Sequence, residues 1–190
     1  MQPEEQLIQR VREGNREATA ELIERYRRMG MTLAVKMLRS QQDAEEALQD
    51  GFVRAIRSIH SFDNRAKFAT WFYRIVYNVC LSRLRQKGEK YVVSIDDEDV
   101  HTDRAIMSYE TPERMYEESE MQEVVARELD KLSPHYRTVL TLFVQQELNY
   151  QEIAEVTGMP LGTVKTNLFR ARAILKERLE KHYAYSKEQV

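Results

Sequence analysis

Basic and hydroxyl side chains gather on one stretch near the C-terminal end of the chain. Between Gly162 and Leu175 the sequence carries Lys165, Arg170 and Arg172 and no acidic residue. Lysine and arginine donate hydrogen bonds to phosphates and to the guanine acceptors of the DNA major groove, and threonine does so more weakly. A helix that is merely solvated usually mixes both signs of charge. The stretch therefore favours a helix that binds nucleic acid, and the solvated face of an ordinary helical hairpin is the alternative.

The residues around this stretch predict a helix-turn-helix that would position it. Ser133-Pro134 is a typical helix start, because serine caps an N-terminus and proline fits the first turn. Asn149 and Glu152 have the spacing of a capping box for a second, short helix, and Gly158 is suited to ending it. A Met-Pro turn leads to the last helix, whose expected apolar stripe is Val164, Leu168, Ala171 and Leu175. In such a unit the recognition helix enters the major groove.

A second candidate surface for nucleic acid is the most aromatic part of the chain, residues 68–78. On a helix, Tyr73 and Tyr77 fall partly off the expected apolar stripe. They are neighbours of Arg74 and Asn78. Aromatic side chains mixed with cationic and amide groups stack unpaired bases and hold their phosphates. A crowded aromatic core, from which arginine extends only its charged end, is the alternative that the residues leave open.

A third polar surface belongs to the helix expected after residue 43. The apolar stripe of this helix is the cleanest in the chain and consists of Ala44, Leu48, Phe52, Ile56 and Ile59. The opposite side is polar and carries Glu45, Glu46, Gln49, Asp50, Arg54 and Arg57. It is acidic early and basic late, as the helix dipole favours. Spacing alone therefore favours a solvated face.

Length and composition limit the class of protein. With 190 residues, 42% of them hydrophobic and 32% charged, the chain is expected to be soluble and to hold one or two domains. No apolar run approaches the about 20 residues that cross a bilayer. The acidic start, Met1 to Glu5, lacks the basic and apolar regions of a signal peptide. We therefore expect a cytoplasmic protein without membrane insertion.

The cysteine and the histidines do not predict a reactive or metal-binding site. Cys80 is the only cysteine, so an internal disulfide is excluded, and its helical surroundings favour a small buried hydrophobe. The histidines are scattered and lack metal-ligand spacing: His60, His101, His135 and His182. We expect no metal, no cofactor and no catalytic residue.

Charge is segregated along the chain although the net charge is only −2. The segment from Ser94 to Glu123 is strongly acidic, with Arg104 and Arg114 its only basic residues. Acidic groups oppose the phosphate neutralisation that supplies most non-specific DNA affinity, so the chain alone should bind DNA weakly and should need a partner. The fold class that follows is all-α, with two small helical domains joined by a flexible acidic linker. The expected boundaries are 1–90 for the first domain, 91–120 for the linker, 121–183 for the helix-turn-helix domain and 184–190 for a tail.

Three segments of the chain, in this order, resemble one known family. They are Asp43-Ala-Glu-Glu-Ala-Leu-Gln-Asp-Gly-Phe52, Phe68-Ala-Thr-Trp-Phe-Tyr-Arg-Ile-Val-Tyr-Asn78 and Gly162-Thr-Val-Lys-Thr-Asn-Leu-Phe-Arg-Ala-Arg172. They are similar to the polymerase-binding helix, the promoter-melting segment and the recognition helix of bacterial RNA polymerase sigma factors of the extracytoplasmic-function (ECF, sigma-70-like) group. With the acidic linker between them, the resemblance covers nearly the whole chain.

The resemblance implies a non-catalytic role in transcription initiation and assigns residues to it. Docking on the clamp helices of the largest polymerase subunit falls to Glu46, Gln49, Asp50 and Arg54. The downstream promoter element and strand separation fall to Phe62, Asn64, Lys67, Trp71, Arg74, Tyr77, Asn78, Arg83 and Arg85. The upstream element, read in the major groove, falls to Thr163, Lys165, Thr166, Asn167, Phe169, Arg170 and Arg172. The helices before the last would rest on the flap of the second-largest subunit, and an anti-sigma factor is a further implied partner.

Some positions depart from the family pattern. Asn167 stands where a basic residue is frequent, a difference that would either remove a phosphate contact or change a base preference, since asparagine favours adenine. Ala171 replaces a frequent glycine and should strengthen the helix. The segment Cys80-Leu81-Ser82 lacks the acidic residue that is usual before the basic run. These departures bear on the promoter sequence, not on the class.

Two other classes of protein compete with this interpretation. A helix-turn-helix transcriptional regulator would bind an operator tightly without polymerase, but it would have little use for the aromatic residues beside a basic run. An enzyme of the helical-bundle kind would use paired carboxylates such as Glu45 and Glu46, but the sequence has no Glu-x-x-His pair to complete a metal site. No small-molecule substrate is expected.

Overall fold

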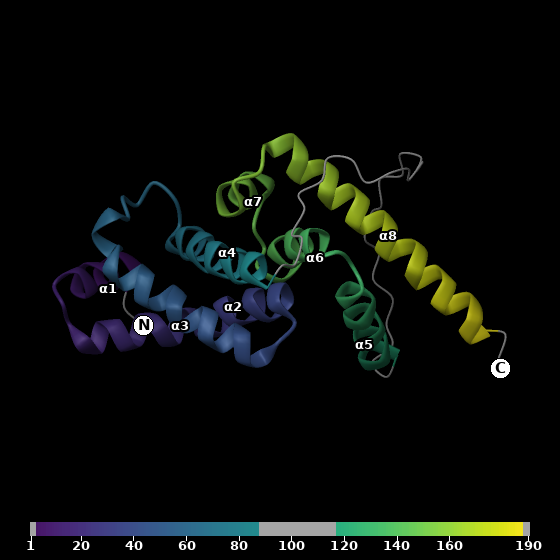
Figure 1. Ribbon diagram of the computed structural model, residues 1–190, viewed down its shortest axis with the longest axis horizontal. Coiled ribbons are helices and arrows are strands. Elements are labelled where there is room, and N and C mark those ends of the chain that lie inside the picture. Colours follow the sequence, from purple (N-terminus) through teal and green to yellow (C-terminus); the bar gives the residue numbers. More distant parts are fainter. Residues whose placement is uncertain (1–2, 88–116, 188–190) are drawn as a thin grey trace.

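The computed structural model describes residues 3–87 and 117–187, and every regular element within them is a helix (Figure 1). The all-α prediction is therefore confirmed for the described residues. The expected acidic linker lies outside them except for its last residues, which begin a helix at Glu117. None of the described helices is long and apolar enough to span a membrane.

The N-terminal half is a bundle of helices around an aromatic core. Its elements are α1 (Glu4–Arg12), α2 (Arg16–Leu38), α3 (Gln41–Arg57), the 3-10 turn η1 (Ile59–Ser61) and α4 (Phe68–Gln86). The rings of Phe52 and Phe72 stack with centroids 4.7 Å apart between α3 and α4. Gly30 lets α2 approach this core closely, because a Cβ there would lie 2.6 Å from Leu48 and 3.1 Å from Phe72. Of the predicted apolar stripe, Ala44, Leu48 and Phe52 of α3 and Ile59 of η1 belong to the core of this bundle, whereas Ile56 is only half-buried.

Local capping sets where these helices start and stop. The side chain of Asn15 accepts a hydrogen bond from the backbone N–H of Ala18, 2.9 Å away, at the start of α2. Ser40 accepts one from Asp43 in the same way, so α3 begins at Gln41, earlier than the sequence pattern indicated. Arg39, with φ of 57°, ends α2 in the left-handed conformation. The connection between α2 and α3 is therefore very short.

The C-terminal half contains the predicted helix-turn-helix. Its elements are α5 (Glu117–Asp130), α6 (Pro134–Leu140), the wider π-helical turn η2 (Thr141–Gln145), α7 (Tyr150–Thr157) and α8 (Leu161–Lys187). The capping box is confirmed: Asn149 and Glu152 exchange side-chain and backbone hydrogen bonds of 2.9 and 3.0 Å. Gly158, with φ of 73°, ends α7 as predicted.

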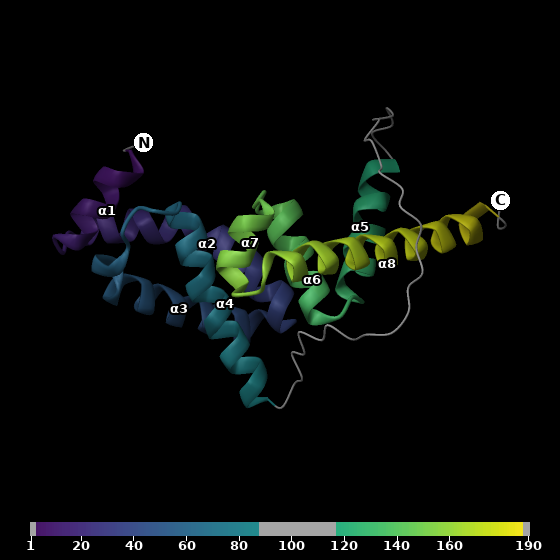
Figure 2. The ribbon, with the colours of Figure 1, turned by 90° about the horizontal axis from the view of Figure 1, so that it is seen from above.

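The last helix is longer than its pattern suggested. The expected tail from residue 184 continues α8 as far as Lys187. Ion pairs four residues apart support the preceding turns, for example between Lys181 and Glu177 at 2.6 Å. Figures 1 and 2 show α8 running away from the N-terminal half, with α5 beside it.

The two halves pack directly against each other. In Figure 1, α7 lies beside α4 and α6 beside α2, and buried hydrophobic residues of both halves form one cluster. Residues far apart in the sequence are therefore brought together along α2 and α4.

Candidate nucleic-acid and polymerase interfaces

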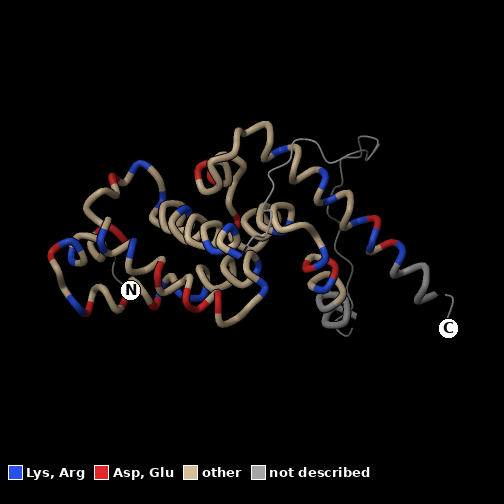
Figure 3. Tube along the Cα trace, in the orientation of Figure 1, with Lys and Arg blue, Asp and Glu red and all other residues tan. Residues whose placement is uncertain are grey.

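The outer side of α8 presents the basic face that the sequence predicted. Lys165, Thr166, Phe169 and Arg172 are exposed, and Figure 3 shows basic residues along this part of the helix. The guanidinium carbon of Arg172 lies 4.5 Å from the centre of the Phe143 ring, an arrangement that holds the cation near the helix-turn-helix surface. Thr163 and Arg170 are half-buried at the edge of the same face. This face can meet the edges and phosphates of a DNA groove.

Asn167 does not belong to that face. Its side chain is 3% exposed, and its amide nitrogen lies 3.7 Å from the sulfur of Met159 inside the domain. Asn167 lies three residues after Val164 and one before Leu168, so it shares their inward stripe. A base contact by Asn167 does not fit this buried placement, so Asn167 is not part of the exposed basic face of α8.

The exposed side of α4 carries a second polar stripe. Arg74, Asn78 and Arg85 are all exposed and recur at spacings of four and seven residues, so they lie along one side of the helix. Trp71 is half-buried and Tyr77 is 2% exposed. The stripe presents cations and an amide, and Tyr77 belongs to the core instead.

Phe62 is also part of the core rather than an open base-binding group. It is 4% exposed, with its ring centroid 5.4 Å from that of Phe68 and 5.3 Å from that of Trp71. The loop that follows it is exposed at Asn64, whose φ of 59° is left-handed, and at Lys67. Asn64 can therefore reach a nucleic acid from its present position. Lys67 is exposed but already forms an ion pair with Glu152 of α7, and Phe62 would first have to leave its neighbours.

Arg83 lies on the side of α4 that faces α3. Its guanidinium is 2.9 Å from the carboxylate of Glu46 and 2.7 Å from that of Asp50, and these two hydrogen bonds, Asp50 first, raise its pKa. One turn further on, Lys87 lies 2.6 Å from Asp43 and lowers the pKa of that carboxyl, as Ser40 also does. Arg83 was expected to bind DNA, but in this structure it joins α4 to two residues expected to bind polymerase.

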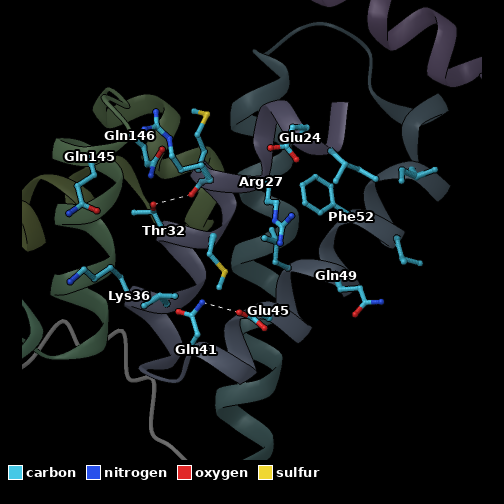
Figure 4. Close-up of a pocket in the computed structure, with 18 residues that line it drawn as sticks. Glu24, Arg27, Thr32, Lys36, Gln41, Glu45, Gln49, Phe52, Gln145 and Gln146 are labelled. Atoms are coloured by element: carbon cyan, nitrogen blue, oxygen red, sulfur yellow. Dashed lines mark hydrogen bonds between the residues drawn. The ribbon is translucent and has the colours of Figure 1, made fainter. Parts of the chain in front are cut away.

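The expected polymerase-docking residues divide over two sides of α3. Gln49 lines an open groove of about 1360 Å³ between α2 and α3, together with Phe52, Val53 and Ile56 (Figure 4). The exposed apolar surface includes Val53, which is 43% exposed. Asp50 and Arg54 line a smaller pocket between α3 and α4. The groove reaches across the domain boundary, because Gln145 and Gln146 line it too.

Two sets of contacts, not expected from the sequence, fasten the domains together. In the first set, which we term the carbonyl clasp, Arg137 donates to the backbone oxygens of Lys36, Asp130 and Leu132, and Arg39 donates to the last two of these. Arg137 is 1% exposed, and its partners include the ends of α2 and α5, where helix dipoles favour a cation. An ion pair of 2.6 Å between Lys36 and Asp130 adds to the clasp.

The second set joins α7 and its preceding turn to the first half of α4 and to the residue before it. The Nζ of Lys67 lies 3.0 Å from an Oε1 oxygen of Glu152. The hydroxyl of Tyr73 donates to the side-chain oxygen of Gln146, and burial raises the pKa of this tyrosine. Tyr73 is therefore covered by the C-terminal half and is not open to a base.

Comparison with known proteins identifies the family. The Sigma-70 region 2 family model matches residues 22–90, and the Sigma-70 region 4 model matches residues 122–175. The chain is 34% identical to the ECF RNA polymerase sigma factor SigW of Bacillus subtilis, over 90% of this chain and 94% of that protein. It belongs to the ECF sigma factors. It is also 32% identical to the RNA polymerase sigma-H factor of Pseudomonas aeruginosa, over 93% of this chain and 94% of that protein.

Solved structures agree with the fold of this sigma factor. A structure of CnrH in complex with the cytosolic domain of CnrY matches with a TM-score of 0.64 at 24% identity, covering 92% of this chain and 96% of that one. The sigma factor RpoE of Bartonella quintana, in complex with the anti-sigma factor NepR, matches with a TM-score of 0.62 at 22% identity, covering 85% and 96%. At these identities the likeness concerns the fold.

Within this sigma factor, the residues that sequence reasoning missed belong to the domain boundary. The sequence does not indicate the interdomain contacts of Arg39, Arg137 and Gln146. Each of these residues lies in a segment where a polar residue on the outer side of a helix is ordinary. Glu152 was recognised only as a capping residue. Its second role, as the partner of Lys67, depends on a contact between positions far apart in the sequence.

Proposed function

We propose that this ECF sigma factor directs core RNA polymerase to promoters with two DNA elements, one read by α8 and one held by α4. The observation that carries the proposal is the exposed, acid-free face of α8 on the helix-turn-helix that matches sigma region 4. Lys165, Thr166, Phe169 and Arg172 are the candidates for the upstream element, with Thr163 and Arg170 at the edge. Lysine and arginine suit guanine and phosphate, and an exposed phenylalanine suits the methyl group of thymine.

The downstream element is assigned to the exposed stripe of α4 and to the loop before it. Arg74 and Arg85 would hold strand phosphates, Asn78 would bind a base edge, and Lys67 and Asn64 would meet the flipped strand. Flipping a base costs a few kcal/mol, which pocket and phosphate contacts offset. Trp71 is the aromatic residue best placed to stack, because it is half-buried rather than enclosed.

Polymerase docking is assigned to α3. Gln49 and the apolar groove beside it support one contact, and Asp50 and Arg54 support another on the α4 side. By family resemblance the clamp helices of the largest subunit would take this surface, and the flap of the second-largest subunit would take the helix-turn-helix domain. The role is non-catalytic and is expected in the cytoplasm, where bacterial transcription occurs.

An anti-sigma factor is the further partner that we propose. The support comes from the two structural neighbours described above, of which one was solved with the cytosolic domain of CnrY and the other with the anti-sigma factor NepR. The groove between α2 and α3 combines apolar residues such as Phe52, Val53 and Ile56 with charged and amide residues, a lining that suits an amphipathic helix.

A transcription assay with purified core polymerase tests the proposal. The protein is added to genomic fragments and new start sites are mapped, and new starts that share two spaced upstream elements are expected. The double variant Asp50→Asn/Arg54→Gln should lose polymerase binding, whereas Lys165→Ala should keep it and lose promoter binding. Glu13→Gln/Arg16→Gln is the control, because it makes the same charge change on two exposed residues, one at the end of α1 and one at the start of α2. Absence of both new starts and polymerase binding would leave an operator-binding regulator as the better account.

A further inference from the structure

The C-terminal domain occupies part of the surface assigned above to promoter strands. Lys67 lies at the start of α4 and is exposed, yet its ammonium group already has an anionic partner in Glu152 of α7. In the second contact of the same boundary, Tyr73 is fully buried and its hydroxyl donates to the side chain of Gln146, just before α7. The contacts fall on the promoter-melting segment and not on a neutral part of the N-terminal domain.

The carboxylate of Glu152 is held in place by a contact that does not involve Lys67. Its Oε2 oxygen accepts the backbone N–H of Asn149 at 2.9 Å, which leaves Oε1 for the Lys67 ammonium at 3.0 Å. Partial burial opposes ionisation of this carboxyl, but the Asn149 and Lys67 contacts outweigh it and keep its pKa lowered. A fixed carboxylate at an ammonium group supplies the charge that a DNA phosphate would otherwise supply.

The carbonyl clasp keeps α7 at this position. It ties the end of α2 to the connection between α5 and α6 through Arg39 and Arg137, on a different part of the boundary from Glu152. Because Arg137 is buried, its hydrogen bonds to the backbone oxygens are shielded from water and are stronger than those of a solvated surface contact.

We propose that Glu152 acts as an internal substitute for a DNA phosphate on Lys67, so that α7 and a single strand of DNA exclude each other on α4. The inference rests on the proposed function of the α4 surface and adds a self-inhibited state to it. The closed protein binds single strands weakly, and the domains must separate before the start of α4 can be used. The favoured competitor is a single-stranded nucleic acid, since unpaired bases and phosphates fit the exposed residues around Lys67.

The test compares two glutamates of α7 in the full chain without polymerase. Glu152→Gln keeps the capping bond to Asn149, because glutamine serves in a capping box, and removes only the charge opposite Lys67. Glu155→Gln makes the same charge change on an exposed position of the same helix. The probe is a fluorescein-labelled single-stranded DNA of about 20 nucleotides and mixed sequence, which is longer than the site size of a typical single-strand-binding domain. Its binding is measured by fluorescence anisotropy at low salt.

Glu152→Gln should bind the oligonucleotide about two- to fivefold more tightly than the wild type, the change that a partly exposed ion pair of about 0.5–1 kcal/mol gives. Glu155→Gln should stay at the wild-type affinity. In a Lys67→Gln background the effect of Glu152→Gln should vanish. Equal affinities of the two glutamine variants, or an effect of Glu152→Gln that persists without Lys67, would overturn the inference.

A third variant separates this inference from the proposed function. Arg74→Ala should weaken oligonucleotide binding, because Arg74 is exposed on the α4 stripe. If Arg74→Ala weakens binding but Glu152→Gln does not strengthen it, the strand surface stands and the self-inhibited state is wrong. If Arg74→Ala leaves binding unchanged, the strand surface itself is wrong and the inference falls with it.

Discussion

Replacing Arg137 by methionine is expected to destabilise the whole protein, because this buried side chain links both domains. Its guanidinium donates to the backbone oxygens of Lys36, Asp130 and Leu132. Arg39 also donates to Asp130 and Leu132, so those two oxygens keep a donor in the variant, whereas the oxygen of Lys36 loses the guanidinium.

The magnitude follows from that difference. A hydrogen bond to a charged group contributes about 1.5–3 kcal/mol, and replacing the remaining buried atoms by a side chain of another shape adds about 1 kcal/mol. We therefore expect a loss of about 3 kcal/mol in the free energy of unfolding. For a chain of this length such a loss lowers the melting temperature by about 6–12 °C.

Thermal unfolding followed by circular dichroism measures the effect, with Lys165→Met as the control. Lys165 is exposed on α8, and its replacement should change the free energy of unfolding by about 0.5 kcal/mol or less. Arg39→Gln alone should lower the free energy of unfolding only slightly. The loss in the double variant with Arg137→Met should exceed the sum of the two single losses by about 1 kcal/mol, because two carbonyls then lose both donors. A loss below about 1 kcal/mol for Arg137→Met, or strict additivity of the pair, would refute this account of the clasp.

Three further predictions use other parts of the molecule. Lys165→Ala should weaken promoter binding and reduce the slope of log affinity against log salt by about 1, and an unchanged slope would remove Lys165 from the phosphate contacts. Gly30→Ala should lower the melting temperature because its Cβ would lie 2.6 Å from Leu48, whereas Gly162→Ala, with open space around it, should raise or maintain it. Burial raises the pKa of Cys80 to about 12, so the folded protein should resist alkylation. Since the unfolded thiol ionises near pH 9, stability should fall as pH rises above that value, and less steeply in Cys80→Ala.

Local features of the fold were predictable because they depend on neighbouring residues. The capping box at Asn149 and the end of α7 at Gly158 each require a few adjacent positions, and the structure has both. The stripe of α3 follows from helical spacing alone. The inward position of Asn167 also follows from helical spacing, since it lies three residues after Val164, although the family resemblance implied a base contact.

The domain boundary was not predictable in the same way. Arginine side chains are usually solvated, and nothing near Arg137 in the sequence indicates that this side chain will be buried and will donate to the backbone oxygen of Lys36 in α2. The aromatic segment left a core and a base-stacking surface as equal alternatives. The structure divides them: Phe62, Tyr73 and Tyr77 are buried, whereas Arg74 and Asn78 are exposed.

The groove between α2 and α3 has a thermodynamic consequence, because residues of both domains line it. A helix that fills the groove as far as Gln145 and Gln146 gains contacts only while the domains are together. Such a ligand binds the closed form better and, by linkage, shifts the population toward it, tenfold for every 1.4 kcal/mol of preference. A helix that uses only the α2 and α3 part has no such preference and leaves the population unchanged. The length of a partner's helix therefore decides whether binding the same groove locks this sigma factor or leaves its domains free to part.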